Sequence, residues 1–546
     1  MKALHRPKAV TLLAVSALAL ASCSGASGSD QKSEEPVKGG KLTYAVNAEP
    51  VNLDPHASAQ DVTGLFARPV LDSLVSMDAK GTIRPWLASS WKISEDQKTY
   101  SFTLRKGVRF TDGTPFDAEA VKANLDHIVD PKTKSEMAAG YIEPYEGTKV
   151  TGERTLEVSF SRPHSPFLNA LSTAYFGMQS PEQLEKGADA LAKKLVGTGP
   201  FVMKDFTPRE GITYTRNDQY AWGPAGARHK GPAHLKELEF TVLTEDSARL
   251  GALTGGQAHA VANVPPAAVE QVEASPDLRM EKRQAPGGAY TYYPNTEKGP
   301  FKDARVRQAF RDGIDFETVV EKLYFGVFAH ATNPLSPATP GYDKRAGTHW
   351  RHNPKKAAAL LDEAGWTGRD SGGYRTKDGK RLTVTWPFVK AANREQRSTL
   401  AEQIQAEAKD LGFELVLDTG TQHELAADYG KGEYDVMDLS WQRADGDALR
   451  NLFSSASIAT PEKFGQNASR LDDERVDEWL GDALATTDAK KRAALYAKVQ
   501  RQVTNEAAAF PVYVVSYLMG ASENAQGIDW DPQAYPTFYD AWVTDQ

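Results

Sequence analysis

The sequence has one cysteine in 546 residues, at position 23. A single thiol excludes an internal disulfide and any site built from several thiolates, such as a structural zinc site. A chain of this length has a core large enough to fold without such cross-links. Beyond residue 22 the sequence also has no apolar run of the roughly 20 residues that a transmembrane helix needs.

Clustered positive charge is missing as well. The chain carries 64 lysine and arginine residues against 72 aspartate and glutamate residues, for a formal net charge of −8. Binding to nucleic acid needs grouped lysine and arginine side chains, and no basic run or stripe occurs. We therefore expect no nucleic-acid partner, and the acidic surface mainly favours solubility.

The motifs of common enzyme chemistries are also missing. The sequence contains no GxSxG nucleophile elbow and no GxxxxGK[ST] phosphate loop. His423 and Glu424 begin a stretch like the zinc motif HExxH, but Ala427 stands where the second histidine is required. The sequence therefore predicts no catalytic residues, no metal and no cofactor, and a surface-tethered secreted hydrolase is the rival class of function.

The N-terminus has the pattern of a secretion signal. Three basic residues within the first eight precede an apolar run over 9–20, which is too short to span a bilayer. Residues 20–23, Leu-Ala-Ser-Cys, resemble a bacterial lipobox, in which the cysteine takes a lipid before cleavage. Ordinary cleavage after Ala21 is the alternative. We predict a signal peptide over 1–22 and a lipidated Cys23, which place the protein at the extracytoplasmic face of the bacterial cell membrane.

Residues 23–38 and the segments after them predict how the remaining chain is built. The stretch 23–38 is rich in glycine, serine and charged residues and predicts a flexible linker. Residues 41–46 alternate as a strand. A helix over about 394–411 leads into an alternating strand at 413–417, which is the unit of an α/β layer. The apolar run 510–518 predicts a further β segment.

A polar segment follows the strand pattern at 434–439. It contains Trp441, Arg443, Asp445 and Asp447. Because ligands bind beyond the ends of strands in α/β layers, this segment is a candidate ligand site. A solvated turn is the alternative interpretation.

Several stretches stand in a recognisable order along the chain. They are residues 39–45, 53–56 (Leu-Asp-Pro-His), 83–91, 99–116, 197–201, 301–310 and 360–366. Together they resemble the family 5 extracellular solute-binding proteins of ABC importers, which include oligopeptide-, dipeptide- and nickel-binding proteins. The resemblance covers almost all of the chain that follows the linker.

The resemblance implies a periplasmic-binding-protein-like α/β fold of the cluster C type, with two hinged lobes and an inserted α+β domain. Lobe I would comprise 39–75, 198–286 and 507–546, the inserted domain 76–197, and lobe II 287–506. It also implies a monomer that encloses a small solute between its lobes. That solute would then pass to an ABC permease in the membrane.

In peptide-binding members of this family, an aspartate three residues after a tryptophan pairs with the α-ammonium group of the peptide. Here Ala444 stands three residues after Trp441, and Asp445 follows one place later. Either the loop carries an extra residue, or the peptide anchor is missing. We expect Asp445 to face a ligand ammonium group, Trp441 to wall the site and Arg443 to meet a ligand carboxylate.

Three further aromatic residues complete the predicted site. Tyr290 and Tyr292 follow a predicted lobe crossing at 286–288, and Trp386 ends a predicted strand. Core packing is the alternative role for each. A peptide is the expected ligand, and a nickel chelate, haem, an oligosaccharide or a signalling peptide are the alternatives within the same fold.

Overall fold

The computed structural model describes residues 35–388, 394–420, 422–463 and 465–544. The predicted signal peptide over 1–22, Cys23 and most of the predicted linker lie outside these residues. Within the described ranges, no helix combines the length and the apolar character that crossing a membrane requires.

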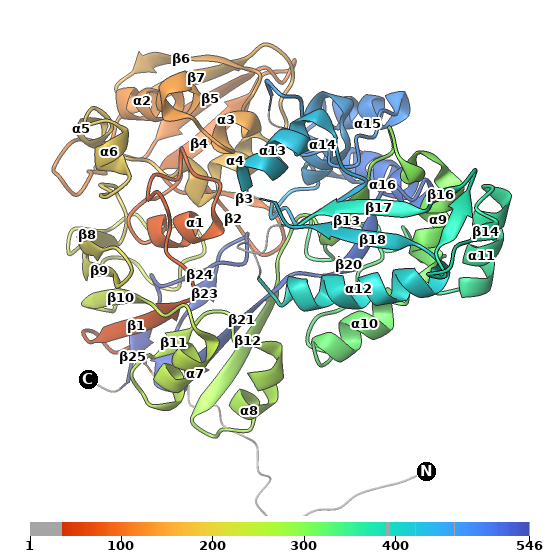
Figure 1. Cartoon of the computed structure of the whole chain (residues 1–546). Helices are drawn as coiled ribbons and strands as arrows, with labels where there is room; N and C mark the ends of the chain where they lie inside the picture. Colours follow the sequence, from red (N-terminus) through yellow and green to blue (C-terminus); the bar gives the residue numbers. More distant parts are fainter. Residues whose placement is uncertain (1–34, 389–393, 421, 464, 545–546) are drawn as a thin grey trace, which may run out of the picture. The chain divides into compact units, whose positions relative to one another are not determined.

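Lobe I is built on a mixed sheet of seven strands in the order β12-β21-β11-β1-β10-β9-β8 (Figure 1). The central strand β1 runs parallel to β10 and β11, and the other neighbours are antiparallel. The strands are β1 (Lys41–Val46), β8 (Phe201–Thr207), β9 (Gly211–Arg216), β10 (Glu237–Val242), β11 (Ala260–Val261), β12 (Leu278–Gln284) and β21 (Ser516–Ser522). The strand predicted at 41–46 is confirmed, and its nearly complete burial fits a strand covered on both faces.

Short helices and strand pairs complete lobe I. The helices are α1 (Asp61–Ala67), α7 (Asp246–Thr254), η3 (Pro266–Ala268) and α8 (Val269–Glu273). The strand pairs are β22 (Ala525–Gln526) with β25 (Trp542–Val543), and β23 (Asp529–Trp530) with β24 (Pro536–Thr537). Phe66 of α1 and Phe240 of β10 pack edge to face in the lobe I core, with ring centroids 5.3 Å apart.

The inserted domain has its own antiparallel sheet and its own core. The sheet order is β4-β5-β7-β6, and α2 packs against this sheet. Asp117 caps α2 by accepting a hydrogen bond from the backbone N–H of Ala120 at 2.9 Å. The elements are β2 (Val75–Met77), β3 (Ile83–Pro85), β4 (Ala88–Ile93), β5 (Thr99–Leu104), α2 (Ala118–Val129), η1 (Pro131–Thr133), α3 (Ala138–Tyr141), β6 (Tyr145–Gly152), β7 (Thr155–Phe160), α4 (Phe167–Leu171), η2 (Ala174–Phe176), α5 (Pro181–Leu184) and α6 (Ala188–Leu191).

Lobe II combines a small antiparallel sheet, a parallel βαβ unit and a group of helices. In the sheet, β13 (Tyr290–Pro294) lies between β19 (Val436–Leu439) and β20 (Phe510–Tyr513). In the βαβ unit, α12 (Arg397–Leu411) joins the parallel strands β17 (Thr383–Pro387) and β18 (Glu414–Asp418). This unit confirms the predicted helix followed by a strand.

The other elements of lobe II surround these sheets. They are η4 (Pro300–Lys302), α9 (Ala304–Gly313), α10 (Phe316–Leu323), α11 (Pro354–Glu363), β14 (Gly368–Arg369), β15 (Arg375–Lys377), β16 (Lys380–Arg381), α13 (Gln422–Lys431), α14 (Ala448–Phe453), η6 (Ser455–Ser457), α15 (Glu474–Leu484) and α16 (Ala489–Asn505). The helix α16 packs on α15, and α11 packs on α9.

Two neighbouring segments carry the chain between the lobes. The β12–β21 pair of lobe I ends with Gln284 opposite Ser516, and the β13–β20 pair of lobe II begins with Tyr290 opposite Tyr513. The crossing segments are therefore 285–289 and 514–515. The predicted run 510–518 is divided between the lobes, because one apolar pattern serves strands in two different sheets. The chain re-enters lobe I after Tyr513, not at the expected residue 507.

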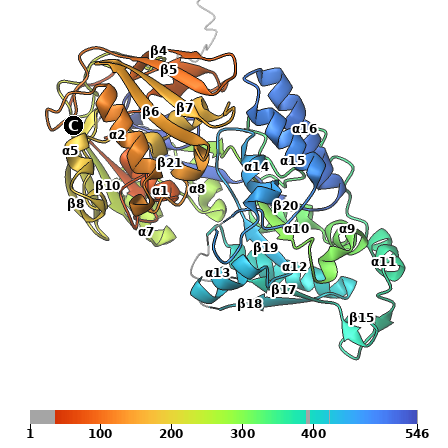
Figure 2. The same ribbon diagram turned by 90° about the horizontal axis from the view of Figure 1, so that it is seen from above.

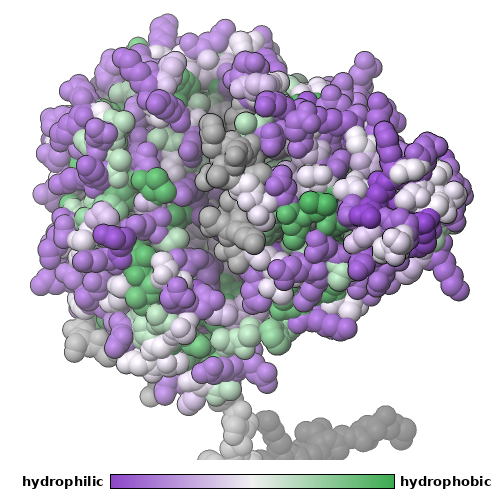
Figure 3. Space-filling model, viewed as in Figure 1, coloured by the Kyte–Doolittle hydropathy of each residue, from purple (hydrophilic) through white to green (hydrophobic). Residues whose placement is uncertain are grey.

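These observations confirm the predicted α/β fold with two lobes and an inserted domain. Figures 1 and 2 both show β17, β18 and α12 of lobe II apart from β8 and β10 of lobe I. On the face shown in Figure 3, hydrophobic residues form small separate patches within a mainly hydrophilic surface. The largest exposed hydrophobic side chains, such as Val51 and Phe325, are likewise scattered along the chain.

Candidate functional site

A cavity of about 580 Å³ lies where lobe I, lobe II and the inserted domain meet. Lobe I lines this interlobe cavity with Tyr44 and residues 46–49 at the end of β1, and with residues 59–62 and Leu65 around the start of α1. Lobe II lines it with Arg394 and residues 440–442, which directly follow β19. The cavity therefore lies beyond the carboxyl ends of strands from both lobes, where ligands bind in α/β layers.

Aromatic side chains form much of the cavity wall. Trp441 comes from lobe II, Tyr175 from the inserted domain, and Tyr517, Trp530 and Tyr535 from lobe I. Tyr517 and Tyr535 pack edge to face with ring centroids 5.5 Å apart. Aromatic faces suit apolar or ring-bearing parts of a small molecule, and the hydroxyl and indole groups add hydrogen-bonding capacity.

One ion pair crosses the cavity from lobe to lobe. The Arg394 guanidinium of lobe II lies 2.8 Å from the Asp61 carboxylate of lobe I. Both side chains keep contact with solvent, with 43% and 26% of their surface exposed. Glu49 also lines the cavity, and its carboxylate accepts a hydrogen bond from the backbone N–H of Arg209. Two carboxylates and one guanidinium are thus the charged groups of the described lining.

A partly buried network adjoins Arg394, which pairs with Glu395. The Glu395 carboxylate pairs with Arg397 at 2.6 Å and accepts a hydrogen bond from the Tyr513 hydroxyl at 2.8 Å. Burial alone would raise the pKa of Glu395, but Arg397 and Arg394 hold it below its ordinary value. The network fixes the segment that presents Arg394, and it ties that segment to the end of β20.

Residues 440–447, here called the Trp441 loop, are held by the crossing segment 285–289. The backbone N–H of Gly288 donates to the Trp441 carbonyl at 2.7 Å, and that of Arg443 donates to the Pro286 carbonyl at 3.1 Å. Gly287 has φ +106°, and a side chain there would overlap the Trp441 carbonyl oxygen. The position of Trp441 in the cavity wall is therefore coupled to the crossing between the lobes.

Of the six predicted ligand-binding residues, Trp441 alone lines the interlobe cavity. It also lines a neighbouring cavity of about 550 Å³ between the inserted domain and lobe II. Met137 lines both cavities as well. Trp441 therefore stands at the boundary between two hollow regions.

Asp445 lies outside the cavity lining. Its carboxylate is buried and pairs with Arg492 of α16 at 2.8 and 3.0 Å. It also accepts a hydrogen bond from the side chain of Asn169 in the inserted domain. We predicted that this carboxylate would pair with a ligand ammonium group. In the structure its partners are protein side chains instead.

Arg443 is buried on the same side of the loop. Its guanidinium pairs with Asp447 at 3.0 Å and lies over the ring of Tyr141, 4.1 Å from the centroid. Asp447 also pairs with Arg450 at 3.0 Å. Burial would raise the pKa of Asp447, but Arg450 and Arg443 hold it below its ordinary value. Both charges predicted to face a ligand thus face protein partners.

Tyr290, Tyr292 and Trp386 lie in the core of lobe II, each at most 1% exposed. The Tyr290 hydroxyl and the Trp386 indole N–H both donate to Asp438 of β19, each at 2.7 Å. Tyr292 packs on Trp386 with ring centroids 4.6 Å apart. These residues support the end of β19, from which the Trp441 loop begins.

The main lining residues missed by the sequence reasoning are Arg394, Asp61 and Trp530. Asp61 follows the loop after β1, so its place beyond a predicted strand was a usable signal. Arg394 and Trp530 carry no local signal, because they come from segments that meet the cavity only in the folded chain.

Comparisons with known proteins agree with this geometry. Residues 82–460 match the family described as "Bacterial extracellular solute-binding proteins, family 5 Middle". The nickel-binding periplasmic protein of Escherichia coli is 26% identical over 501 residues, covering 90% of this chain and 92% of that protein. Heme-binding protein A of Haemophilus influenzae is 26% identical over 568 residues, covering 97% and 98%.

A solved structure gives the same result. NikA from Brucella suis in complex with Fe(III)-EDTA superposes with a TM-score of 0.80 at 25% identity, covering 92% of this chain and 100% of that one. The family match spans more than half of the sequence. The chain belongs to the family 5 extracellular solute-binding proteins of ABC importers, which bind small ligands and interact with a permease.

Proposed function

We propose that this protein captures a short peptide in the interlobe cavity and delivers it to an ABC permease. The observation that carries the proposal is the cavity of about 580 Å³ lined from both lobes. Its charged lining, two carboxylates and one guanidinium, complements a zwitterion. The ligand ammonium group faces Glu49 or Asp61, its carboxylate faces Arg394, and its side chains lie against the aromatic wall.

Capture works by a shift between open and closed arrangements of the lobes. A solute favours the closed arrangement only through contacts with both lobes. Lobe I offers Asp61 and Trp530, and lobe II offers Arg394 and Trp441. The two short crossing segments are the hinge. The solute is released unchanged, and mass spectrometry of the recovered solute distinguishes this proposal from a hydrolase.

A metal chelate is the second candidate ligand. The relative from Brucella suis holds Fe(III)-EDTA, and the E. coli relative is a nickel-binding protein. A chelate with free carboxylates would meet Arg394 directly, with its organic arms against Trp441 or Trp530. No protein ligand to the metal is needed for this mode of binding.

Calorimetry with separate pools tests the proposal. One arm uses di- to pentapeptides, and the other uses nickel or iron chelates. We expect saturable binding of one ligand per chain in the peptide arm. Trp441→Ala removes an aromatic wall and should weaken that binding by roughly 1–3 kcal/mol, or about 5- to 150-fold.

Trp479→Ala is the matched control, because Trp479 is also partly buried but lies on α15, away from the cavity. We expect it to leave affinity unchanged. Equal affinities of wild type and Trp441→Ala would contradict the placement of the ligand. Binding in the chelate arm alone would replace the peptide assignment with the second candidate.

We also propose that Cys23 is lipidated and that the chain is a monomer on the extracytoplasmic face of the membrane. The lipobox-like sequence at 20–23 and the polar linker after it support this anchoring. Cys23→Ser should move the protein from the membrane fraction to the soluble fraction. Light scattering of that soluble form should give the mass of one chain.

A further inference from the structure

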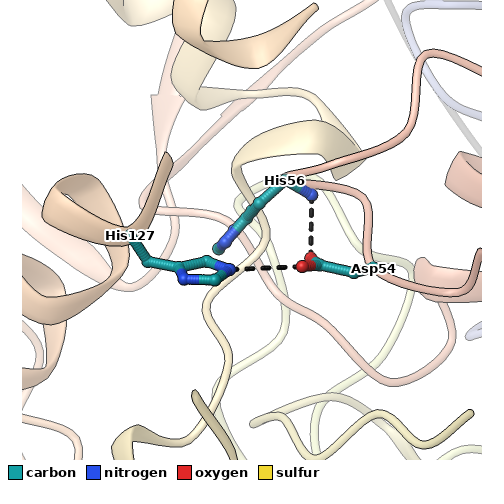
Figure 4. A group of neighbouring side chains, drawn as sticks. All are labelled: Asp54, His56 and His127. Carbon is teal, nitrogen blue, oxygen red and sulfur yellow. Dashed lines mark hydrogen bonds and ion pairs between the residues drawn. The ribbon is translucent and has the colours of Figure 1, made fainter. Parts of the chain in front are cut away.

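Two histidines and one aspartate converge at the joint between lobe I and the inserted domain (Figure 4). Asp54 and His56 lie in the lobe I loop between β1 and α1, and His127 lies near the end of α2. One ligand atom from each residue lies within 4.8 Å of the other two. Among the described residues, this is the one group of three or more histidine, cysteine, aspartate or glutamate side chains close enough together to hold a metal ion.

We propose that Asp54, His56 and His127 form a binding site for a divalent transition metal of the Zn²⁺ type. Zinc binds imidazole nitrogen and carboxylate oxygen at about 2.0–2.2 Å, so tetrahedral donors lie about 3.3 Å apart. His127 Nε2 and Asp54 Oδ2 are already 3.2 Å apart. His56 is the third donor, with a ring nitrogen within 4.8 Å of a ligand atom on each of the other two residues.

The outer contacts of the histidines leave the required nitrogens facing inward. His56 Nε2 donates to the Gly177 carbonyl at 2.9 Å, so Nδ1 carries the lone pair, and it lies 3.5 Å from the Gln179 amide nitrogen that contacts Asp54. The Thr133 hydroxyl donates to the His127 carbonyl at 2.5 Å, so it accepts from His127 Nδ1, 3.2 Å away. Such outer hydrogen bonds orient histidine ligands in metal sites.

The carboxylate and its surroundings are also prepared for a cation. Asp54 Oδ1 accepts hydrogen bonds from the Gln179 amide at 2.8 Å and from the His56 backbone N–H at 3.0 Å, which leaves Oδ2 toward His127. The Gln179 side-chain oxygen is buried and has no hydrogen-bond partner among the described residues. It lies on an amide that already contacts the cluster.

The donor set selects the class of metal. Two imidazoles and one carboxylate suit Zn²⁺, Ni²⁺ or Co²⁺, whereas Mg²⁺ and Ca²⁺ prefer oxygen donors. His127 keeps 19% of its side chain exposed, which gives the ion a route from solvent. The three residues are absent from the lining of the interlobe cavity, so this site is separate from the proposed solute site.

A metal ion at this site would cross-link lobe I and the inserted domain. It would join the loop that leads to Asp61 with helix α2 of the inserted domain. An ion that binds the folded chain more tightly than the unfolded chain raises thermal stability. Zn²⁺ should therefore raise the midpoint of thermal unfolding.

The test uses the untagged, metal-stripped chain and titrates Zn²⁺ by calorimetry, with Mg²⁺ as the comparison ion. We expect one Zn²⁺ per chain, no saturable Mg²⁺ binding, and visible absorption of four-coordinate Co²⁺ when Co²⁺ is substituted. His127→Gln keeps a polar contact with Asp54 and should weaken Zn²⁺ binding by roughly tenfold or more. It should also abolish the thermal shift.

Two controls locate the effect. His229→Gln alters a histidine that pairs with Asp540 at 2.8 Å, and Arg394→Ala alters the interlobe cavity. We expect both variants to bind Zn²⁺ as the wild type does. If His127→Gln does not fold, Asp54→Asn gives the same test with a smaller change. Unchanged Zn²⁺ binding in the folded variant, or no saturable Zn²⁺ binding to wild type, would overturn the proposal. The three residues would then form only a hydrogen-bonded contact between lobe I and the inserted domain.

Discussion

The charged side chains on the two sides of the Trp441 loop differ in their burial and in their partners. Toward the interlobe cavity, a single, partly exposed ion pair joins Arg394 to Asp61. Toward the inserted domain, Asp445 and Asp447 are buried and paired with arginines. The partly exposed charges on the cavity side are the ones that we propose exchange partners with a solute. Charges on the other side hold the loop, because a buried ion that loses its partner is strongly destabilising.

This difference bears on how a binding protein keeps its site in place. The loop contacts the inserted domain through Asn169 with Asp445 and through Tyr141 with Arg443. These contacts position Trp441 without occupying the cavity. In the proposed capture mechanism, the contacts at the cavity itself can then be few and weak, which keeps closure of the lobes reversible.

Among the variants that test this difference between the two sides of the loop, Asp445→Ala should have the largest effect. It leaves Arg492, whose side chain is only 14% exposed, without its carboxylate, so we expect a loss of about 3 kcal/mol in the free energy of unfolding. Solute affinity of the folded protein should change much less. Urea unfolding and calorimetry measure the two effects, and Asp445→Asn, which keeps one acceptor oxygen for Arg492, should lose less stability. Lost affinity at unchanged stability would restore Asp445 as a ligand anchor.

A second buried carboxylate predicts a pH dependence. Asp72 accepts hydrogen bonds from Thr198 and Trp222, both at 3.0 Å, yet burial raises its pKa to about 7. The folded chain therefore holds this proton between pH 4 and 7, where the unfolded chain releases it. Stability from this group falls as pH rises through that window, so Asp72→Asn should gain roughly 2–4 kcal/mol relative to wild type from pH 4 to 8.

Asp78→Asn is the control for that slope. Backbone hydrogen bonds from Thr82 and Lys80, with help from Arg84, hold the pKa of Asp78 below its ordinary value. Its contribution is present at neutral pH and is lost as pH falls, so this variant should show the opposite trend. Parallel pH profiles for the two variants would contradict the burial argument.

Gly287→Ala tests the coupling between the crossing segment and the Trp441 loop. The new side chain would overlap the Trp441 carbonyl at a φ of +106°, so we expect a loss of about 1–3 kcal/mol and weaker solute binding. Gly226→Ala introduces the same strain at φ +107° with nothing within 4 Å. If both variants behave alike, the crossing does not position the loop.

The smallest expected effect is on the ion pair across the cavity. A double-mutant cycle of Arg394→Ala and Asp61→Asn should give a coupling below about 1 kcal/mol in the stability of the solute-free protein. The Arg84–Asp78 pair, at 2.9 Å with 50% and 29% exposure, is the matched comparison. With solute bound, the Arg394 variant alone should release it faster in stopped-flow measurements. Equal release from Arg84→Ala would remove Arg394 from the site.

Helices and strands were predictable from the sequence where one hydrophobic pattern corresponds to one element. The strand at 41–46 and the helix α12 with its following strand were confirmed, because their periodicity reports a single buried face. The run 510–518 was not resolved into two strands, since β20 and β21 are equally apolar but lie in different lobes. Tyr290 and Trp386 show the same limit, because a core aromatic and a ligand-binding aromatic have the same local sequence signature.

The order of short motifs along the chain was enough to assign the family, because those motifs resemble the ones that family members carry in the same order. The α/β architecture follows from that resemblance, and the hydrophobic periodicity of single helices and strands agrees with it. Which charges line the interlobe cavity was decided only in the folded chain. Asp445, Arg443 and Asp447 find partners on α16, on α14 and within their own loop, while Arg394 and Asp61 meet across the lobes. The physical reason is that a charged side chain takes its role from whichever group burial places beside it, and these groups come from distant parts of the sequence.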